Sequence, residues 1–303
     1  MQLARPKATH RTRATLIGSV AVILWSLLAL ITTGATGIPP FQLTALSFVV
    51  GSGVGFVFLA GRGPGTLAKL RQRPAAWLLG VSGLFGFHFF YFLGLARAPA
   101  VDASLLTYLW PLLIVLFSAL LPGESVRWFH LAGAALGLLG AALLVTQGGS
   151  MQLESKYLVG YLAAIAAAVT WAAYSVLNRR FGDVPTEAVA GFCAVTAALA
   201  FLCHGALETW VWPSAGQWLS IGLLGLGPVG AAFFVWDHGT KHGDLQILGT
   251  LAYAAPLLST LFLVLAGEAE ATWTVAWACL LIAGGALLAS KQMLRRRRAS
   301  EAS

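Results

Sequence analysis

Four aromatic or polar side chains lie close together in sequence that is otherwise strongly apolar, and they are the first candidates for ligand binding. They are His88, Tyr91, Tyr108 and Trp110. His88 and Tyr91 are three residues apart and would share one face of a helix. Rings that carry an imidazole, a hydroxyl or an indole N–H offer both apolar surface and hydrogen bonds, as sites for small molecules do. This stretch therefore predicts a binding site lined by uncharged side chains.

A similar pattern recurs in the second half of the chain. Trp171 and Ser175 are four residues apart and would lie on one helical face. Tyr253 lies three residues before Pro256, as a tyrosine also precedes Pro111. A proline inside a helix lacks the backbone donor and frees the carbonyl four residues earlier. We therefore expect both prolines to kink their helices and to expose main-chain groups to a ligand.

The composition indicates an integral membrane protein. Of the 303 residues, 58% are hydrophobic and 10% are charged, whereas a soluble domain carries roughly 25% charged residues. The formal net charge of +8 could suggest a nucleic-acid partner, but the basic residues lie between apolar runs or at the termini rather than in one stripe. The composition thus predicts the lipid bilayer as a partner and no nucleic acid.

Apolar runs of about 20 residues, each long enough to cross a bilayer as a helix, recur along the chain. The first of them could be a secretory signal, but it is longer than the apolar core of about 7–15 residues in a typical signal peptide. We therefore predict ten transmembrane helices, at residues 14–33, 41–60, 75–96, 100–121, 128–146, 158–178, 186–206, 216–236, 245–266 and 271–290.

The basic residues predict the orientation of these helices. All lysines and arginines except Arg97 and Lys156 fall in segments that would lie on one side of the membrane. Cytoplasmic segments of membrane proteins carry an excess of Lys and Arg. We therefore place this side in the cytoplasm, and an even number of spans then places both termini there.

The chain contains two copies of one unit. A shift of 145 residues aligns Phe90–Leu113 with Val235–Leu258 and pairs the two prolines. Because five spans per copy is an odd number, the second copy would insert in the opposite orientation, as in many secondary transporters. Trp110 is matched by Ala255, so we expect the first copy to supply more of the binding chemistry. The expected units are a cytoplasmic tail at 1–13, a first repeat at 14–147, a second repeat at 158–290 and a basic cytoplasmic tail at 291–303.

The candidate residues also have structural interpretations. A histidine at bilayer depth is costly unless it faces a cavity or has a partner, so His88 could line a path, relay protons or only bond to a neighbouring helix. Tyr108 and Trp110 could be interfacial anchors, although they lie near the middle of their span. Trp171 could face the core as readily as a ligand.

Charged and imidazole side chains gather in WDHGTKHGD, from Trp236 to Asp244. Their types would suit a metal or catalytic site. Asp237 and Lys241, however, have the i, i+4 spacing of a helical ion pair. We interpret this pair as a solvated cap or gate in a cytoplasmic loop, and we expect neither a bound metal nor a catalytic residue.

The sequence resembles the EamA branch of the drug/metabolite transporter superfamily over roughly residues 14–290. The resemblance rests on duplicated five-span units, a tryptophan in the first span of each half, and the pattern FLGLARAPAVDASLLTYLWPLL followed by Gly-Glu. The residues of LLTYLWPLL and GFHFFYFLGLA are most similar to the bacterial type that exports aromatic and other amino acids. The resemblance implies an all-α protein of the bacterial inner membrane, with ten helices in two inverted repeats around a central cavity, and alternating access without ATP.

We therefore expect a monomeric secondary transporter that exports aromatic and other neutral amino acids, or similar small metabolites, without a cofactor. Aromatic rings suit apolar substrate side chains, while hydroxyls and freed backbone groups could bind the ammonium and carboxylate groups. A multidrug or nucleotide-sugar carrier of the same superfamily is the alternative, although no basic residue lies within a predicted span to bind a sugar nucleotide. No span carries the central carboxylate that proton-coupled multidrug relatives use. An intramembrane enzyme is disfavoured, because HExxH, GxSxG and paired intramembrane carboxylates are absent from the sequence.

Overall fold

The computed structural model describes residues 8–147, 149, 154–267, 270 and 272–289, and this part of the chain contains helices and connecting loops but no strand. Nine of its helical segments are long and apolar enough to cross a membrane. A further apolar helix, Trp273–Ala289, is shorter. The predicted all-α membrane fold is therefore confirmed. The nine segments are His10–Thr33, Pro40–Gly61, Pro74–Arg97, Ala100–Ser118, Trp128–Thr146, Ser155–Phe181, Thr186–Leu207, Ala215–His242 and Leu245–Leu265.

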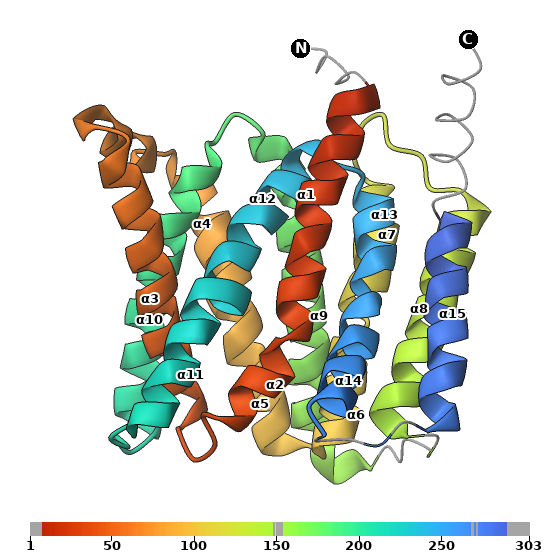
Figure 1. The fold of residues 1–303 in the computed structure, drawn as a ribbon. Helices are drawn as coiled ribbons and strands as arrows, with labels where there is room; N and C mark the ends of the chain where they lie inside the picture. Colours follow the sequence, from red (N-terminus) through yellow and green to blue (C-terminus); the bar gives the residue numbers. More distant parts are fainter. Residues whose placement is uncertain (1–7, 148, 150–153, 268–269, 271, 290–303) are drawn as a thin grey trace.

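Several of these segments contain more than one helix (Figure 1). The α-helices are α1 (Ala8–Ser26), α2 (Leu28–Thr33), α3 (Pro40–Gly61), α4 (Pro74–Val81), α5 (Phe87–Arg97), α6 (Ala100–Thr107), α7 (Trp110–Ser118), α8 (Trp128–Thr146), α9 (Leu158–Leu177), α10 (Val189–Leu207), α11 (Ala215–Leu226), α12 (Ala232–His242), α13 (Leu245–Ala252), α14 (Ala254–Leu265) and α15 (Trp273–Ala289). The short 3-10 and π segments are η1 (Pro64–Leu70), η2 (Ser82–Gly86), η3 (Ser155–Tyr157), η4 (Asn178–Phe181), η5 (Thr186–Ala188) and η6 (Gly227–Ala231).

The predicted spans agree with these segments to within four residues, with one exception. The eighth span continues beyond Trp236 to His242, because α12 does not end at the charged cluster. Asp237 and Lys241 therefore lie inside a helix and are buried. The prediction that they lie in a solvated loop is wrong, because their charges compensate each other and neighbouring polar groups replace water.

The helices are interrupted at matching positions in the two halves. The two π-helical segments, η2 and η6, begin at Ser82 and Gly227, which are 145 residues apart. A second pair of interruptions follows, at Tyr108 between α6 and α7 and at Tyr253 between α13 and α14, with the same offset. The next helix in each case carries a proline in its first turn, where the missing N–H leaves no helical hydrogen bond broken. The interruptions thus follow the repeat in the sequence.

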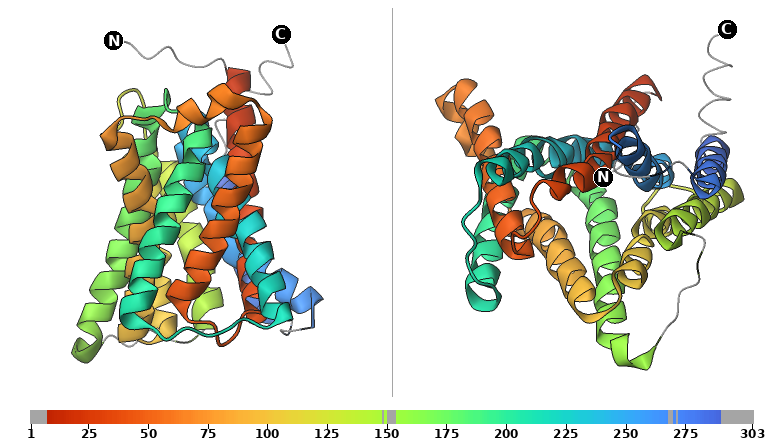
Figure 2. Two further views of the ribbon diagram at one scale, coloured as in Figure 1. Left: turned by 90° about the vertical axis from the view of Figure 1, so that its left-hand side faces the viewer. Right: turned by 60° about the horizontal axis from the view of Figure 1, so that its bottom comes forward.

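The helices pack as an arrangement of paired elements around a centre (Figures 1 and 2). α3 and α10 lie side by side at one edge of the bundle, and α8 and α15 lie side by side at the opposite edge. Between these edges α1 packs against α12, α5 against α9 and α7 against α13. The start of α1 and the end of α15 lie at the same end of the bundle (Figure 1). This arrangement brings α1, α7, α9 and α12 together in the interior.

Small residues allow the paired helices to approach closely. A Cβ atom at Gly55 of α3 would lie 2.6 Å from the Cβ of Ala190 in α10, and one at Gly133 of α8 would lie 2.5 Å from the carbonyl oxygen of Gly285 in α15. No side chain fits at such separations. The GxxxG spacings in α3 and α8 therefore serve helix packing, as small residues do in membranes.

A methyl group at Gly285 should loosen the contact between α8 and α15. A Cβ there meets the backbone of Gly133 at 2.5 Å, whereas the adjacent Gly284 has nothing within 4 Å of an added Cβ. We predict that Gly285→Ala destabilises the protein by about 1–3 kcal/mol, the usual cost of overpacking. Thermal unfolding in detergent should show a melting temperature several degrees lower for this variant. Gly284→Ala is the matched control and should melt with the parent protein, and equal melting temperatures for both variants would contradict the packing argument.

Candidate functional site

Four tryptophans from four different helices meet in the interior of the bundle. They form the tryptophan cluster, which consists of Trp25 in α1, Trp110 in α7, Trp171 in α9 and Trp236 in α12. All six pairs of rings are in contact, with centroid distances from 5.0 Å for Trp25 and Trp236 to 6.3 Å for Trp171 and Trp236. Most pairs meet edge to face or tilted, as aromatic rings prefer. The cluster therefore joins helices from both halves of the sequence.

Hydrogen bonds hold two of these rings in place. Trp236 donates its indole N–H to the hydroxyl of Ser175 at 3.1 Å, and both residues are fully buried. Trp25 donates its indole N–H to the carbonyl of Pro228 in the π segment η6, also at 3.1 Å. A buried indole N–H needs an acceptor of this kind. Ser175, which the sequence places on a face with Trp171, thus orients the tryptophan cluster.

His88 lies beside the tryptophan cluster, among phenylalanines. Its ring is 5.2 Å from that of Phe48 and 6.3 Å from that of Phe233, which also contacts Trp25 and Trp171. Its Nδ1 lies 2.7 Å from the carbonyl oxygen of Leu84 in η2. A carbonyl can only accept, so Nδ1 carries a proton and Nε2 is the acceptor of the neutral ring. The partner of His88 is thus its own helix, and no residue in the described part of the chain forms a hydrogen bond with Nε2.

Tyr91 and Tyr108 lie near the same site, and both are half-buried. The ring of Tyr91 stacks on that of Phe87 at 5.9 Å with an interplanar angle of 5°. Phe87 in turn contacts Trp171 at 5.4 Å. Tyr108 is the residue at which the helix breaks between α6 and α7. The structure thus brings Tyr91 together with the tryptophan cluster and places Tyr108 at the nearby break.

Tyr253 occupies a different place from the other predicted residues. It is fully buried in a second apolar cluster with Val115, Leu257 and Ile282. Its hydroxyl accepts a hydrogen bond from the backbone N–H of Leu112 at 3.1 Å. The helix break at Tyr108 leaves that N–H without its usual partner. Tyr253 therefore joins the two helix breaks to each other.

Five aromatic residues of the site are not among the predicted site residues. They are Trp25, Phe48, Phe87, Phe233 and Trp236. The repeat carries a signal for three of them, because a shift of 145 residues pairs Phe233 with His88 and Trp236 with Tyr91, and a shift of 146 residues pairs Trp25 with Trp171. Phe48 has no aromatic counterpart in the second half.

Asp237 and Lys241 form a compact polar network one turn beyond the tryptophan cluster. The predicted i, i+4 ion pair is present, with 2.9 Å between Lys241 Nζ and Asp237 Oδ2. Asp237 also accepts hydrogen bonds from Asn178 at 3.0 Å and from Thr186 at 2.7 Å, and Lys241 donates to the carbonyl of Val184 at 2.9 Å. These contacts join η4, α12 and the segment before α10, all in the second half. In the described part of the chain, no group of three or more His, Cys, Asp or Glu side chains could hold a metal ion.

Comparisons with known proteins agree on one family. The model of the EamA-like transporter family matches residues 12–146 and again residues 158–291. A protein of Ancylobacter novellus described as the aromatic amino acid exporter YddG is 54% identical over 288 residues, which cover 95% of this chain and 99% of the relative. The protein of the same description in Escherichia coli is 27% identical over 92% of this chain and 97% of its own length. A solved crystal structure with 53% identity superposes with a TM-score of 0.89, covering 93% of this chain and 99% of its own.

Removal of the Tyr253 hydroxyl should destabilise the protein. Tyr253→Phe leaves the buried N–H of Leu112 without an acceptor, which costs about 1–3 kcal/mol. Tyr174 is the matched control, because it is also buried but its hydroxyl has no hydrogen-bond partner among the described residues. We expect Tyr253→Phe to lower the melting temperature by several degrees and Tyr174→Phe to leave it unchanged or raise it. The role given to Tyr253 is wrong if the two variants melt alike.

Proposed function

The chain belongs to the EamA-like transporter family, and from this we propose that it exports amino acids, aromatic ones included, by alternating access. It is a transporter rather than an enzyme, and a multi-pass protein of the bacterial inner membrane. The observation that carries the proposed substrate is the identity of 54% with an aromatic amino acid exporter over nearly the whole of both chains. The tryptophan cluster supports it, because indole rings suit aromatic and other apolar side chains.

The proposed architecture is ten transmembrane helices in two inverted five-helix repeats, at residues 14–147 and 158–290, around a central cavity. The family model matches the two halves separately, and the π segments and helix breaks recur after 145 residues. α15 would be the tenth span: its 17 residues extend over about 25 Å, close to the roughly 30 Å of the hydrocarbon core. One chain supplies both halves, so a monomer would be the working unit.

Both ends of the described chain would face the cytoplasm. The start of α1 and the end of α15 lie at one end of the bundle, as do the segments that follow α3 and α9 (Figure 1). These segments carry Arg62, Lys69, Arg73 and Arg180, while Arg97 and Lys156 lie at the opposite end. The excess of basic residues supports a cytoplasmic assignment for the first of these ends.

The substrate would bind where His88 and Tyr91 face the tryptophan cluster. His88 Nε2 is an acceptor suited to the substrate ammonium group, and the hydroxyls of Tyr91 and Tyr108 are donors suited to the carboxylate. The cluster contains no ionised side chain. A zwitterion with a neutral side chain would therefore be accommodated without an unpaired charge, whereas a substrate with a net charge would be disfavoured.

Truncation of Trp110 should impair transport. Trp110→Ala removes a ring that contacts the three other tryptophans, and the loss of such an aromatic surface corresponds to about a tenfold effect or more. We expect at least this reduction in the uptake of radiolabelled phenylalanine by proteoliposomes. Trp128→Ala is the control, because Trp128 is 67% exposed on the outer face of α8, and it should transport like the parent protein.

Two outcomes would contradict different parts of this proposal. Absence of transport of any amino acid by folded and inserted parent protein would exclude the function itself. Unchanged transport by Trp110→Ala, with the protein as folded as the parent by size-exclusion chromatography, would instead exclude the tryptophan cluster as the binding site. The milder Trp110→Phe keeps an aromatic surface and should retain a larger share of the activity.

A further inference from the structure

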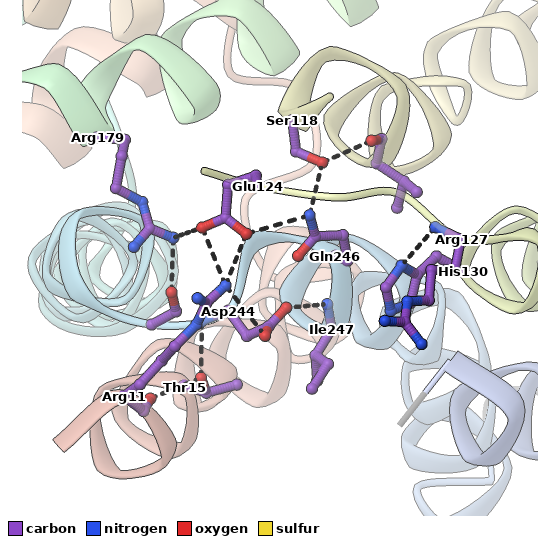
Figure 3. Close-up of polar contacts among 12 residues, drawn as sticks. Arg11, Thr15, Ser118, Glu124, Arg127, His130, Arg179, Asp244, Gln246 and Ile247 are labelled. Carbon is purple, nitrogen blue, oxygen red and sulfur yellow. Dashed lines mark hydrogen bonds and ion pairs between the residues drawn. The ribbon is translucent and has the colours of Figure 1, made fainter. Parts of the chain in front are cut away.

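A second polar assembly lies at the end of the bundle where α1 begins (Figure 3). We define the ionic cluster by Arg11, Glu124, Arg179, Asp244 and Gln246. Arg11 Nη2 lies 3.0 and 2.9 Å from the two carboxylate oxygens of Glu124, and 3.2 Å from Asp244 Oδ2. Arg179 Nη2 lies 3.9 Å from Glu124 Oε1 and donates to the carbonyl of Gly243 at 2.6 Å. Two arginines thus enclose one carboxylate.

Further hydrogen bonds extend the ionic cluster to α7 and α1. Gln246 donates to Ser118 Oγ at 3.1 Å and to Glu124 Oε2 at 3.4 Å. The backbone N–H of Asp244 donates to Thr15 Oγ1 at 2.8 Å. Glu124 therefore interacts with three separate segments of the chain, and it is the central residue of the cluster.

The contacts of the ionic cluster cross from one half of the chain to the other. Arg11 and Glu124 belong to the first half, whereas Arg179, Asp244 and Gln246 belong to the second. The pairs Arg11–Asp244, Glu124–Arg179 and Gln246–Glu124 therefore hold the two halves together. The network around Asp237 instead joins η4, α12 and the segment before α10, which all belong to the second half. The ionic cluster therefore ties together more widely separated parts of the chain than the pair Asp237 and Lys241 does.

The ionic cluster lies at the ends of the same four helices that carry the tryptophan cluster. Ser118, Arg179 and Asp244 each follow a tryptophan of that cluster by eight residues. Eight residues of helix extend over about 12 Å. On α1, Thr15 and Arg11 lie on the same side of Trp25. The ionic cluster therefore covers the tryptophan cluster from one end of the bundle.

Among the described residues, the opposite end of the bundle does not repeat this arrangement of two arginines and two carboxylates. Shifts of 144 to 146 residues relate each member of the assembly to a counterpart at that end. Glu124 corresponds to Glu268, which lies outside the described residues, but neither arginine corresponds to a charged residue. The other counterparts are uncharged, and they are Tyr157 for Arg11, Tyr161 for Thr15, Leu263 for Ser118, Thr33 for Arg179, Pro99 for Asp244 and Val101 for Gln246. A contact between the halves at that end is the hydrogen bond from Tyr161 to Asp102, at 3.3 Å.

We propose that the ionic cluster is the latch that closes the cytoplasmic end of the transport path, and that the resting protein is closed at this end. This inference rests on the proposed function, because the path is the one along which the proposed substrate would move. Opening this end requires the carboxylates of Glu124 and Asp244 to separate from the guanidinium groups. The side chains of the two acids are 13% and 24% exposed, so their pairs are shielded from solvent more than surface salt bridges are. Opposite charges are present in equal number, two and two, so the closed latch buries no net charge.

A distance measurement tests the latch without depending on transport. Nitroxide labels at Ser125 and Arg180, which are exposed and adjacent to Glu124 and Arg179, would report the separation between the segment after α7 and η4 in double electron–electron resonance. The three native cysteines, at positions 193, 203 and 279, would be replaced by serine so that labels attach only at positions 125 and 180. We expect the parent protein in nanodiscs to show mainly one short distance. Glu124→Gln should increase the population of a longer distance roughly tenfold, within the range of measured pair couplings.

Two further variants keep the test decisive. Arg11→Gln removes the opposite partner and should shift the distances in the same direction, so the proposal does not depend on the folding of one variant. Glu187→Gln is the matched control, because Glu187 pairs with Lys69 at the same end of the bundle but lies outside the ionic cluster, and it should leave the Ser125–Arg180 distance unchanged. The latch is excluded if Glu124→Gln and Arg11→Gln both match the parent, or if the parent is mainly in the longer-distance state.

Failure of the latch and failure of the proposed function give different results. Longer distances in Glu124→Gln together with no amino-acid transport by the parent would support the latch and exclude the substrate. Amino-acid transport by the parent together with unchanged distances in both variants would support the function and exclude the latch.

Discussion

The fold depends on one constraint, which is that a backbone polar group inside the bilayer must find its partner within the protein because no water is available there. Departures from regular helix in the described interior meet this constraint in specific ways. The break at Tyr108 frees the amide of Leu112, and the hydroxyl of Tyr253 accepts it. The π segment η6 provides the carbonyl of Pro228 to Trp25, and η2 provides the carbonyl of Leu84 to His88. The irregular helix segments therefore supply hydrogen-bond partners that hold aromatic residues of the site in place.

The same constraint explains why the charged groups lie where they do. Lys241 and Asp237 can be buried in α12 because each has the other, and because Asn178, Thr186 and the carbonyl of Val184 complete their hydrogen bonds. A buried ion pair with its remaining hydrogen bonds satisfied avoids most of the desolvation cost of a lone charge. The tryptophan cluster needs no such compensation because it contains only neutral rings. Charge is concentrated toward one end, and the interior site stays neutral.

Hydropathy predicted the helices well, because a span of about 20 apolar residues has few alternatives in lipid. Hydropathy did not predict the end of α12. The burial of Asp237 and Lys241 there depends on hydrogen-bond partners that are far away in sequence. His88, Trp110 and Trp171 could be selected because a large ring or an imidazole is conspicuous in an apolar span. Trp236 was assigned to the charged cluster that follows it, although the repeat pairs it with Tyr91.

The sequence also could not predict contacts between residues that are far apart along the chain. Tyr253 was selected by its repeat position, but its partner is a backbone amide that no side-chain pattern identifies. The ionic cluster likewise takes single residues from α1, the segment after α7, η4, the segment after α12 and α13, with no local motif in any of them. The separation between Glu124 and Arg11 is 113 positions in sequence. Only the packing of the four helices brings these charges together.

The position of the ionic cluster on the tryptophan-bearing helices links the two assemblies mechanically. A helix is stiff along its axis, so a tilt of α7, α9 or α12 that changes the spacing of the rings also moves the residues eight positions further on. A substrate that bound between the rings, as proposed, would therefore act on the ionic cluster without touching it.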